Sequence, residues 1–138
     1  MSESDTRNLI ERGLAAFNAG DHEGLSASLS EDVAVDVPGE GREIGREKAR
    51  WRLAALARHF RAEVTDIAVM TAPGGLRAAS EFTLRGTYLA ALEGFAPANG
   101  QAFRLPAGLF FDIDDEGLIS RVTVSYDRSR LASELESG

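Results

Sequence analysis

The chain has 138 residues, 43% of them hydrophobic and 27% charged, which is the balance of a folded globular protein rather than a disordered one. Its 15 basic and 22 acidic side chains give a net charge of −7, which argues against nucleic acid or an anionic membrane surface as a partner. Cysteine is absent, which excludes disulfides, thiolate catalysis and sulfur-ligated metals.

The length predicts a single domain over residues 1–138. Residues 1–12 are polar and acidic, without the apolar run of a secretory signal. No stretch of the sequence approaches the roughly 18 apolar residues that a membrane helix requires. We therefore expect a soluble, cytoplasmic protein without a membrane partner.

The first half of the chain predicts three helices and one strand. Apolar residues recur there at spacings of three and four, except between Val33 and Val37, where they alternate with other residues. Gly20-Asp21 suits the end of one helix and the N-cap of the next. In chain order the expected ranges are helices at about 5–19 and 22–29, a strand at 33–37 and a helix at 46–60.

The second half changes to a period of two and predicts a meander of four strands. Pro73-Gly74-Gly75 is a hairpin signal, residues 90–100 form a loop, and residues 114–117 form a turn. The expected strands cover 64–69, 76–89, 101–113 and 118–126. Residues 129–138 are polar, and we expect them to be frayed.

This order of elements predicts an α+β fold. Long strands punctuated by glycine are typical of a strongly curved antiparallel sheet, here wrapped around the three N-terminal helices as a cone. A sheet that curls around helices without closing leaves a pocket at its open end, which is a common small-molecule site.

Six short motifs, in order, carry a family resemblance: Ala16 to Asp21, Asp32 to Gly39, Gly45 to Glu47, Leu84 to Tyr88, Ala98 to Gly100, and Asp115 to Ile119. Over residues 7–128 the chain resembles the nuclear transport factor 2-like superfamily, in particular ketosteroid-isomerase-related and SnoaL-like polyketide cyclase proteins. The resemblance implies a cofactor-independent isomerase or cyclase that acts by acid–base chemistry on an apolar carbonyl compound. The alternative is a non-catalytic ligand-binding or accessory protein of the same fold.

The chain departs from the ketosteroid isomerase pattern at three positions. The tyrosine of that pattern falls near Gly13, its protonated acid near Leu109, and its strand aspartate at Val37, one residue from Asp36. A shift of one residue along a strand moves a side chain to the opposite face of the sheet. A strict steroid isomerase is therefore disfavoured.

Two aspartates are candidates for a catalytic base. Asp36 lies in an apolar strand, where burial inside the cone would raise its pKa. Alternatively Val33, Val35 and Val37 face the core, and Asp36 faces outward to cap or to pair with an arginine such as Arg42. Asp127 follows the last strand, and the resemblance suggests that a Tyr-Asp pair there is catalytic; its alternative is the N-cap of a helix over 128–135.

Two phenols and several aromatic rings are candidates for ligand contacts. Tyr88 could donate a hydrogen bond to an oxyanion or could be an ordinary strand aromatic, and Tyr126 shares the inward parity of Val122 and Val124. Trp51, Phe82 and Phe111 could form the walls of an apolar cavity, as could Phe60, Phe103 and Phe110.

We expect neither a metal nor a cofactor. His22 has no second histidine at a ligand spacing, His59 ends a helix where a cation is favoured, and the sequence contains no glycine-rich phosphate loop.

The resemblance also implies a homodimer formed through the outer face of the sheet. Thr123 and Ser125 are expected on that face because they alternate with the inward-facing Val122 and Val124. Phe110 is expected there because Phe110 and Phe111 have opposite parity.

Overall fold

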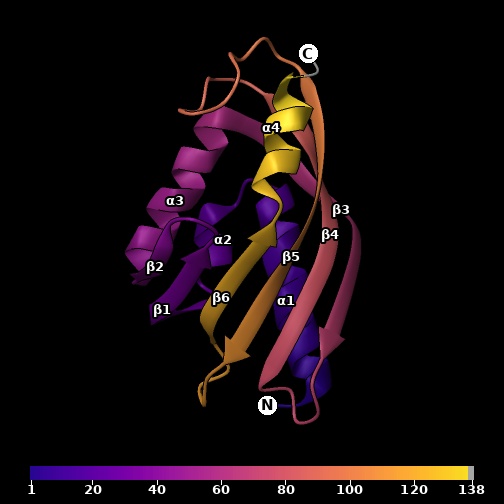
Figure 1. Ribbon diagram of the computed structural model, residues 1–138. Helices are drawn as coiled ribbons and strands as arrows, with labels where there is room; N and C mark the ends of the chain where they lie inside the picture. The colour runs from indigo at the N-terminus through magenta and orange to yellow at the C-terminus, as the bar shows by residue number, and fades with distance from the viewer. Residues whose placement is uncertain (137–138) are drawn as a thin grey trace.

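The computed structural model describes residues 1–136, which form one six-stranded sheet and four helices (Figure 1). The helices are α1 (Glu3–Asn18), α2 (His22–Ser26), α3 (Arg46–His59) and α4 (Arg128–Glu136). The strands are β1 (Leu29–Val37), β2 (Gly41–Ile44), β3 (Phe60–Thr71), β4 (Arg77–Tyr88), β5 (Ala102–Ile113) and β6 (Ile119–Tyr126). Among the described residues, no helix is long and apolar enough to cross a membrane.

The strands follow the order β2-β1-β6-β5-β4-β3, so the sheet is curved but not closed. Its inner face packs against the N-terminal helices, with α1 behind the strands in the view of Figure 1. The predicted α+β cone with N-terminal helices is confirmed. One pairing differs from the antiparallel meander: β1 runs parallel to β6, because β1 arrives from the helical half of the chain and pairs with the last strand.

Polar side chains of α1 protect the β3 edge of the sheet. The Asn18 amide donates to the Val64 carbonyl at 3.0 Å and accepts from the Val64 amide at 2.7 Å, as a neighbouring strand would. The Arg7 guanidinium donates to the Val69 carbonyl at 2.7 Å. These bonds satisfy backbone groups that would otherwise offer an open edge for pairing with another chain.

Strand register sorts the side chains between the two faces of the sheet. Val35, Val122 and Phe111 are register partners: Val35 and Phe111 belong to the main hydrophobic core inside the cone, and Val122 packs against it. The next row of register partners lies on the outer face, because adjacent residues of a strand point to opposite faces. This outer row is Arg42, Asp36, Thr123, Phe110, Ala79 and Met70.

The structure corrects two expectations about the ends of elements. Gly41–Ile44 forms β2, a second strand in the half of the chain where one strand was expected. Residues 128–136 form α4 rather than a frayed tail, because Leu131 and Leu135 lie four residues apart on one helical face and are buried in a second core with Phe60, Tyr88 and Phe103. The expectation for Ser137 and Gly138 lies outside the described residues.

Candidate functional site

The inner face of the sheet carries a strip of apolar side chains that are only partly buried. α1 packs against β3, while α3 packs against β1 and β3, so the helices lie over the flanks of the sheet. The partly buried inner-facing residues on the middle strands are Leu84, Ala107, Leu109, Val122 and Val124, called here the inner strip. Water-accessible apolar surface on the concave side of a sheet is the usual lining of a small-molecule site.

The inner face of β4, β5 and β6 has no acidic or basic side chain among the described residues. In β4 the inward residues are Ala78, Ser80, Phe82, Leu84, Gly86 and Tyr88, and in β5 they alternate from Phe103 to Ile113 without a charge. In β6 they include Val122, Val124 and Tyr126. Hydroxyl groups are therefore the polar groups that these strands present inward.

Asp36 does not enter the cone. It lies on the outer face, where its carboxylate accepts hydrogen bonds from Arg42 at 2.7 and 2.9 Å and from the Thr123 hydroxyl at 2.9 Å. The hydrogen-bonded Arg42 guanidinium lowers the pKa of Asp36 from 3.8 to about 2. The expected desolvated base is thus wrong for Asp36, and the alternative pairing with Arg42 is confirmed. The alternating valines decide this, since they point the opposite way into the core.

The lowered pKa of Asp36 predicts a specific pH dependence of stability. The ionised aspartate stabilises the folded chain above about pH 4, and this contribution is lost as the pH falls from about 4 towards 2. Between these pH values we expect the free energy of unfolding of the wild type to fall more steeply than that of Asp36→Asn, measured by urea denaturation. Parallel curves for the two proteins would contradict the ion pair.

Asp127 is exposed and begins α4. Its carboxylate accepts hydrogen bonds from the backbone amides of Ser129 at 2.9 Å and Arg130 at 3.3 Å. The expected helix N-cap is therefore confirmed. Asp127 does not face the inside of the cone, so the expectation of a catalytic base there is not supported by its position. The two aspartates proposed together as bases lie on different parts of the surface, and neither faces the inner strip.

Tyr88 is fully buried, and its hydroxyl is already engaged. The phenol donates to the Ala96 carbonyl at 2.7 Å and accepts from the Leu92 amide at 2.7 Å, so it fixes the loop between β4 and β5. Phe60 stacks on its ring with the ring centroids 5.3 Å apart. The expectation of a free oxyanion donor is wrong here, because both hydrogen-bonding capacities of the hydroxyl are used inside the protein.

The other aromatic candidates differ in their positions. Tyr126 points inward as predicted, is half-buried beside the second core, and its hydroxyl has no hydrogen-bond partner within residues 1–136. Phe82 and Phe111 are buried in the main core. Trp51 is wrong as a cavity wall: it lies on the outward side of α3 and is 66% exposed.

The structure brings together residues that the sequence did not single out as a site. Leu109, which stands near the acid position of the ketosteroid isomerase pattern, is the register partner of Val124 on the inner strip, and Leu84 lies on the same face further along β4. The alternation of apolar residues along β4 and β5 could have placed Leu84 and Leu109 on the inner face. The solvent exposure that these two side chains retain could not be predicted, because it depends on where α1 and α3 cross the sheet.

No metal site is evident in the described part of the chain, where no three potential ligand side chains gather. His59 donates from Nδ1 to the Ala90 carbonyl at 2.9 Å, so it joins the end of α3 to the loop after β4. The residues present therefore offer hydroxyl groups and apolar surface rather than a metal or phosphate cradle.

Residues 10–122 match the SnoaL-like domain family. The chain belongs to this family. Two solved SnoaL-like relatives are candidate polyketide cyclases. One, from Pseudomonas putida KT2440, is 40% identical with a TM-score of 0.91 over 98% of both chains. The other, from Silicibacter sp. TM1040, is 41% identical with a TM-score of 0.90 over 97% of both chains.

The SnoaL-like chain also shares its fold with more distant proteins. An NTF2-like protein from Burkholderia xenovorans LB400 is 17% identical, with a TM-score of 0.74 over 98% of both chains. This likeness shows the fold alone, which is the fold that the sequence motifs indicated. The comparison with curated proteins gave no match.

Proposed function

We propose that this SnoaL-like protein holds a small, mainly apolar, carbonyl-bearing molecule against the inner strip, and does so without acid–base catalysis by Asp36 or Asp127. The observation that carries the proposal is the exposure of Leu109, Val122 and Val124 on the concave side of central strands. Leu109 and Val122 pack against the main core, and all three residues retain part of their surface exposed to solvent. A ligand that covers this remaining apolar surface gains affinity from the area removed from water.

Tyr126 supplies a means of orienting that ligand. It follows Val124 on the same face of β6, and its hydroxyl has no partner within residues 1–136. A single hydrogen bond from this phenol to a carbonyl oxygen would fix the direction in which the apolar body lies. The absence of charged side chains on the inner face of β4, β5 and β6 favours a neutral ligand over an ionised one.

A second candidate function is cyclisation of a polyketide-like substrate, favoured by relatives about 40% identical that are candidate polyketide cyclases. In that reaction the Tyr126 phenol would stabilise a developing enolate by hydrogen bonding. A proton acceptor would also be needed, and Asp36 and Asp127 are both turned to the outside. Binding without turnover therefore agrees better with the positions of the carboxylates.

A thermal-shift screen followed by product analysis tests both functions. We expect neutral polyketide-like and steroid-like carbonyl compounds to raise the melting temperature, and nucleotides to leave it unchanged. Each stabilising compound is then incubated with the protein and analysed by mass spectrometry and absorbance. Recovery of unchanged compound supports the binding function, whereas a cyclised product at catalytic protein concentration would replace it with the cyclase function. Stabilisation by nucleotides alone would overturn both.

A further inference from the structure

Ser80 carries a buried hydroxyl group whose hydrogen-bonding capacity is not used. The residue lies on β4 and is 2% exposed, and its side-chain oxygen has no hydrogen-bond partner among the described residues. Folded proteins rarely leave a buried polar group in this state, because the hydration that it loses is then not replaced. The Ser80 hydroxyl is therefore a candidate for a bond to a molecule other than the chain itself.

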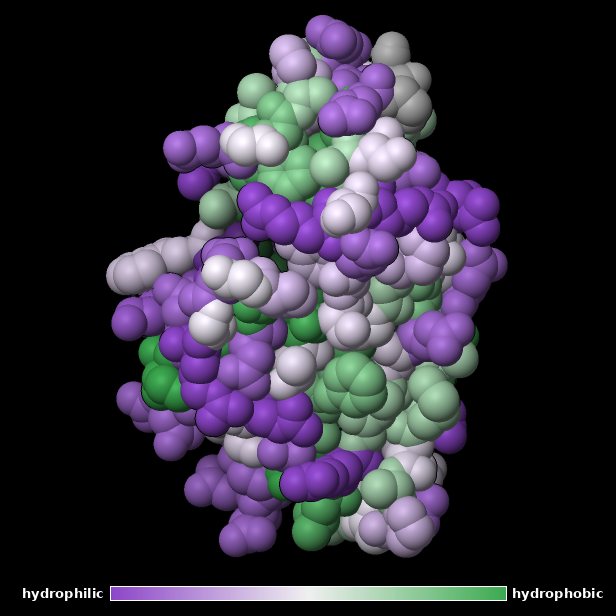
Figure 2. Space-filling view, viewed as in Figure 1, coloured by the Kyte–Doolittle hydropathy of each residue, from purple (hydrophilic) through white to green (hydrophobic). Residues whose placement is uncertain are grey.

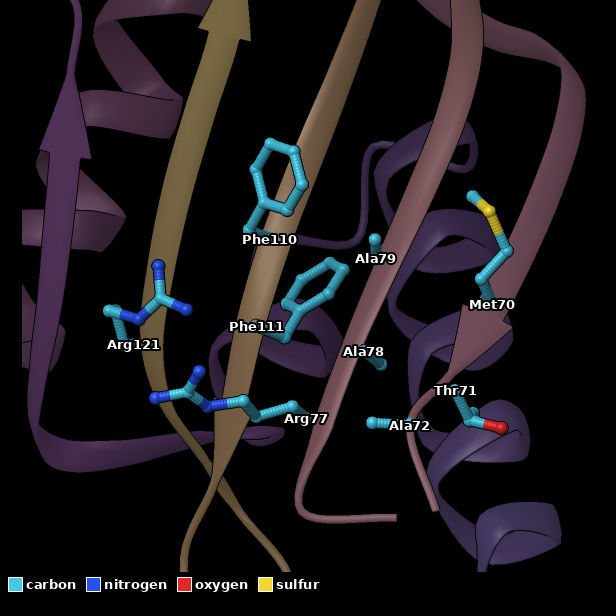
Figure 3. A pocket seen from close by; sticks show the side chains of 9 residues that line it. All are labelled: Met70, Thr71, Ala72, Arg77, Ala78, Ala79, Phe110, Phe111 and Arg121. Carbon is cyan, nitrogen blue, oxygen red and sulfur yellow. The ribbon is translucent and has the colours of Figure 1, made fainter.

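The Ser80 side chain points to the inner face of the sheet. Its neighbour Ala79 lines a shallow hollow of about 300 Å³ on the outer face, which Figure 3 shows. Adjacent residues of a strand point to opposite faces. Phe82, two residues further along β4, is buried in the main core inside the cone. Ser80 shares the facing of Phe82 and is directed into the cone.

Strand register places Ser80 next to the inner strip. Its partner on β5 is Leu109, which is paired in turn with Val124 on β6. Leu109 is only partly buried, so solvent-accessible apolar surface lies one strand away from the Ser80 hydroxyl. A molecule that covers Leu109 is thereby brought to the side of Ser80.

Tyr126 provides a second inward hydroxyl on the opposite side of this apolar surface. It lies two strands from Ser80 and two residues beyond Val124, on the same face of β6. The spacing of strands and of residues along a strand puts the Cα atoms of Ser80 and Tyr126 about 12 Å apart. Ala107 and Leu109 lie on β5 between them. The inner face thus presents two hydroxyl groups with apolar surface between them.

The charged side chains of the same strands lie on the outer face. They include Arg77 and Glu81 on β4 and Arg121 on β6. Figure 2 looks onto this outer face and shows hydrophilic side chains around apolar surface in its lower centre. An ionised ligand on the inner face would lose hydration without gaining an opposite charge from β4, β5 or β6. Neutral oxygen groups, such as carbonyls, are the polar groups that suit the two hydroxyls.

We propose that Ser80 is a second ligand-positioning residue of the inner strip, and that the ligand is a neutral, mainly apolar compound with an oxygen group at each end. One carbonyl oxygen accepts a hydrogen bond from Tyr126. The other accepts from Ser80 once the partly buried Leu109 side chain turns aside. The inference rests on the proposed function and narrows its ligand class from one carbonyl group to two that are held apart.

Isothermal titration calorimetry with two matched probes tests this assignment. Para-acetylbiphenyl carries one carbonyl group, and para,para′-diacetylbiphenyl carries one at each end of the same rigid body. We expect Ser80→Ala to weaken binding of the diacetyl compound at least about fivefold, and that of the monoacetyl compound less than about twofold. Ser125→Ala is the same substitution at an exposed position on the outer face of β6, and this matched control should change neither affinity.

Urea denaturation without a ligand gives an independent test. Because the Ser80 hydroxyl has no partner within residues 1–136, we expect Ser80→Ala to keep or raise the urea midpoint of the wild type. A lower midpoint would show that the hydroxyl is bonded inside the folded protein, and it would overturn the inference. An equal effect of Ser80→Ala on both probes, or no effect on either, would overturn the Ser80 contact and leave the proposed function standing. Failure of both probes to bind the wild type would count against the proposed function and the Ser80 contact together.

Discussion

Val124→Asp is expected to lower the affinity for the ligand identified by thermal shift at least about a hundredfold. Val124 is partly exposed on the inner strip, beside Leu109 in the register of β5 and β6. A carboxylate at this position would lose hydration whenever an apolar molecule covers it, and no basic side chain on the inner face of β4, β5 or β6 would compensate for the loss. Isothermal titration calorimetry measures the change.

Two further variants make this result specific. Ser125→Asp adds the same charge at the next residue of β6, on the outer face, and should leave ligand affinity within about twofold of the wild type. Val124→Phe keeps the position apolar but fills space above the strip, so it should also weaken binding while the protein stays folded. Unchanged affinity in both Val124 variants would mean that the ligand lies elsewhere.

Tyr88→Phe is expected to lower the free energy of unfolding by about 1–3 kcal/mol, because two partly buried backbone groups each lose a hydrogen bond. The phenol is the partner of the Ala96 carbonyl and of the Leu92 amide, each at 2.7 Å. Without it, neither group has a replacement in the loop between β4 and β5. Urea denaturation, followed by circular dichroism, gives the difference.

Tyr126→Phe is the matched control for this loss of a hydroxyl. Its phenol has no hydrogen-bond partner within residues 1–136, so we expect its stability to stay within about 0.5 kcal/mol of the wild type. If ligand binding uses that hydroxyl, Tyr126→Phe should weaken affinity while Tyr88→Phe should not. Equal stability of Tyr88→Phe and the wild type would contradict the structural role of the loop bonds.

The sequence by itself determined the class of fold and the facing of several strand residues. Alternating valines at 33, 35 and 37 favoured the outer face for Asp36 over the catalytic position inside the cone, and the structure pairs it there with Arg42. The parity of Phe110 and Phe111 likewise assigned them to opposite faces. These properties follow from the period of two in a strand, which is local and can be read without knowing what packs against it.

The tertiary structure alone decided which of these residues form a site. Trp51 is exposed, Tyr88 is sealed behind its loop, and the polar segment after Asp127 becomes a helix because Leu131 and Leu135 dock on Phe103. Leu109 and Val122 stay only partly buried because the helices cross the flanks of the sheet rather than its centre. Each outcome depends on contacts between segments far apart in the chain. A local pattern fixes which face a side chain lies on, but not what covers that face.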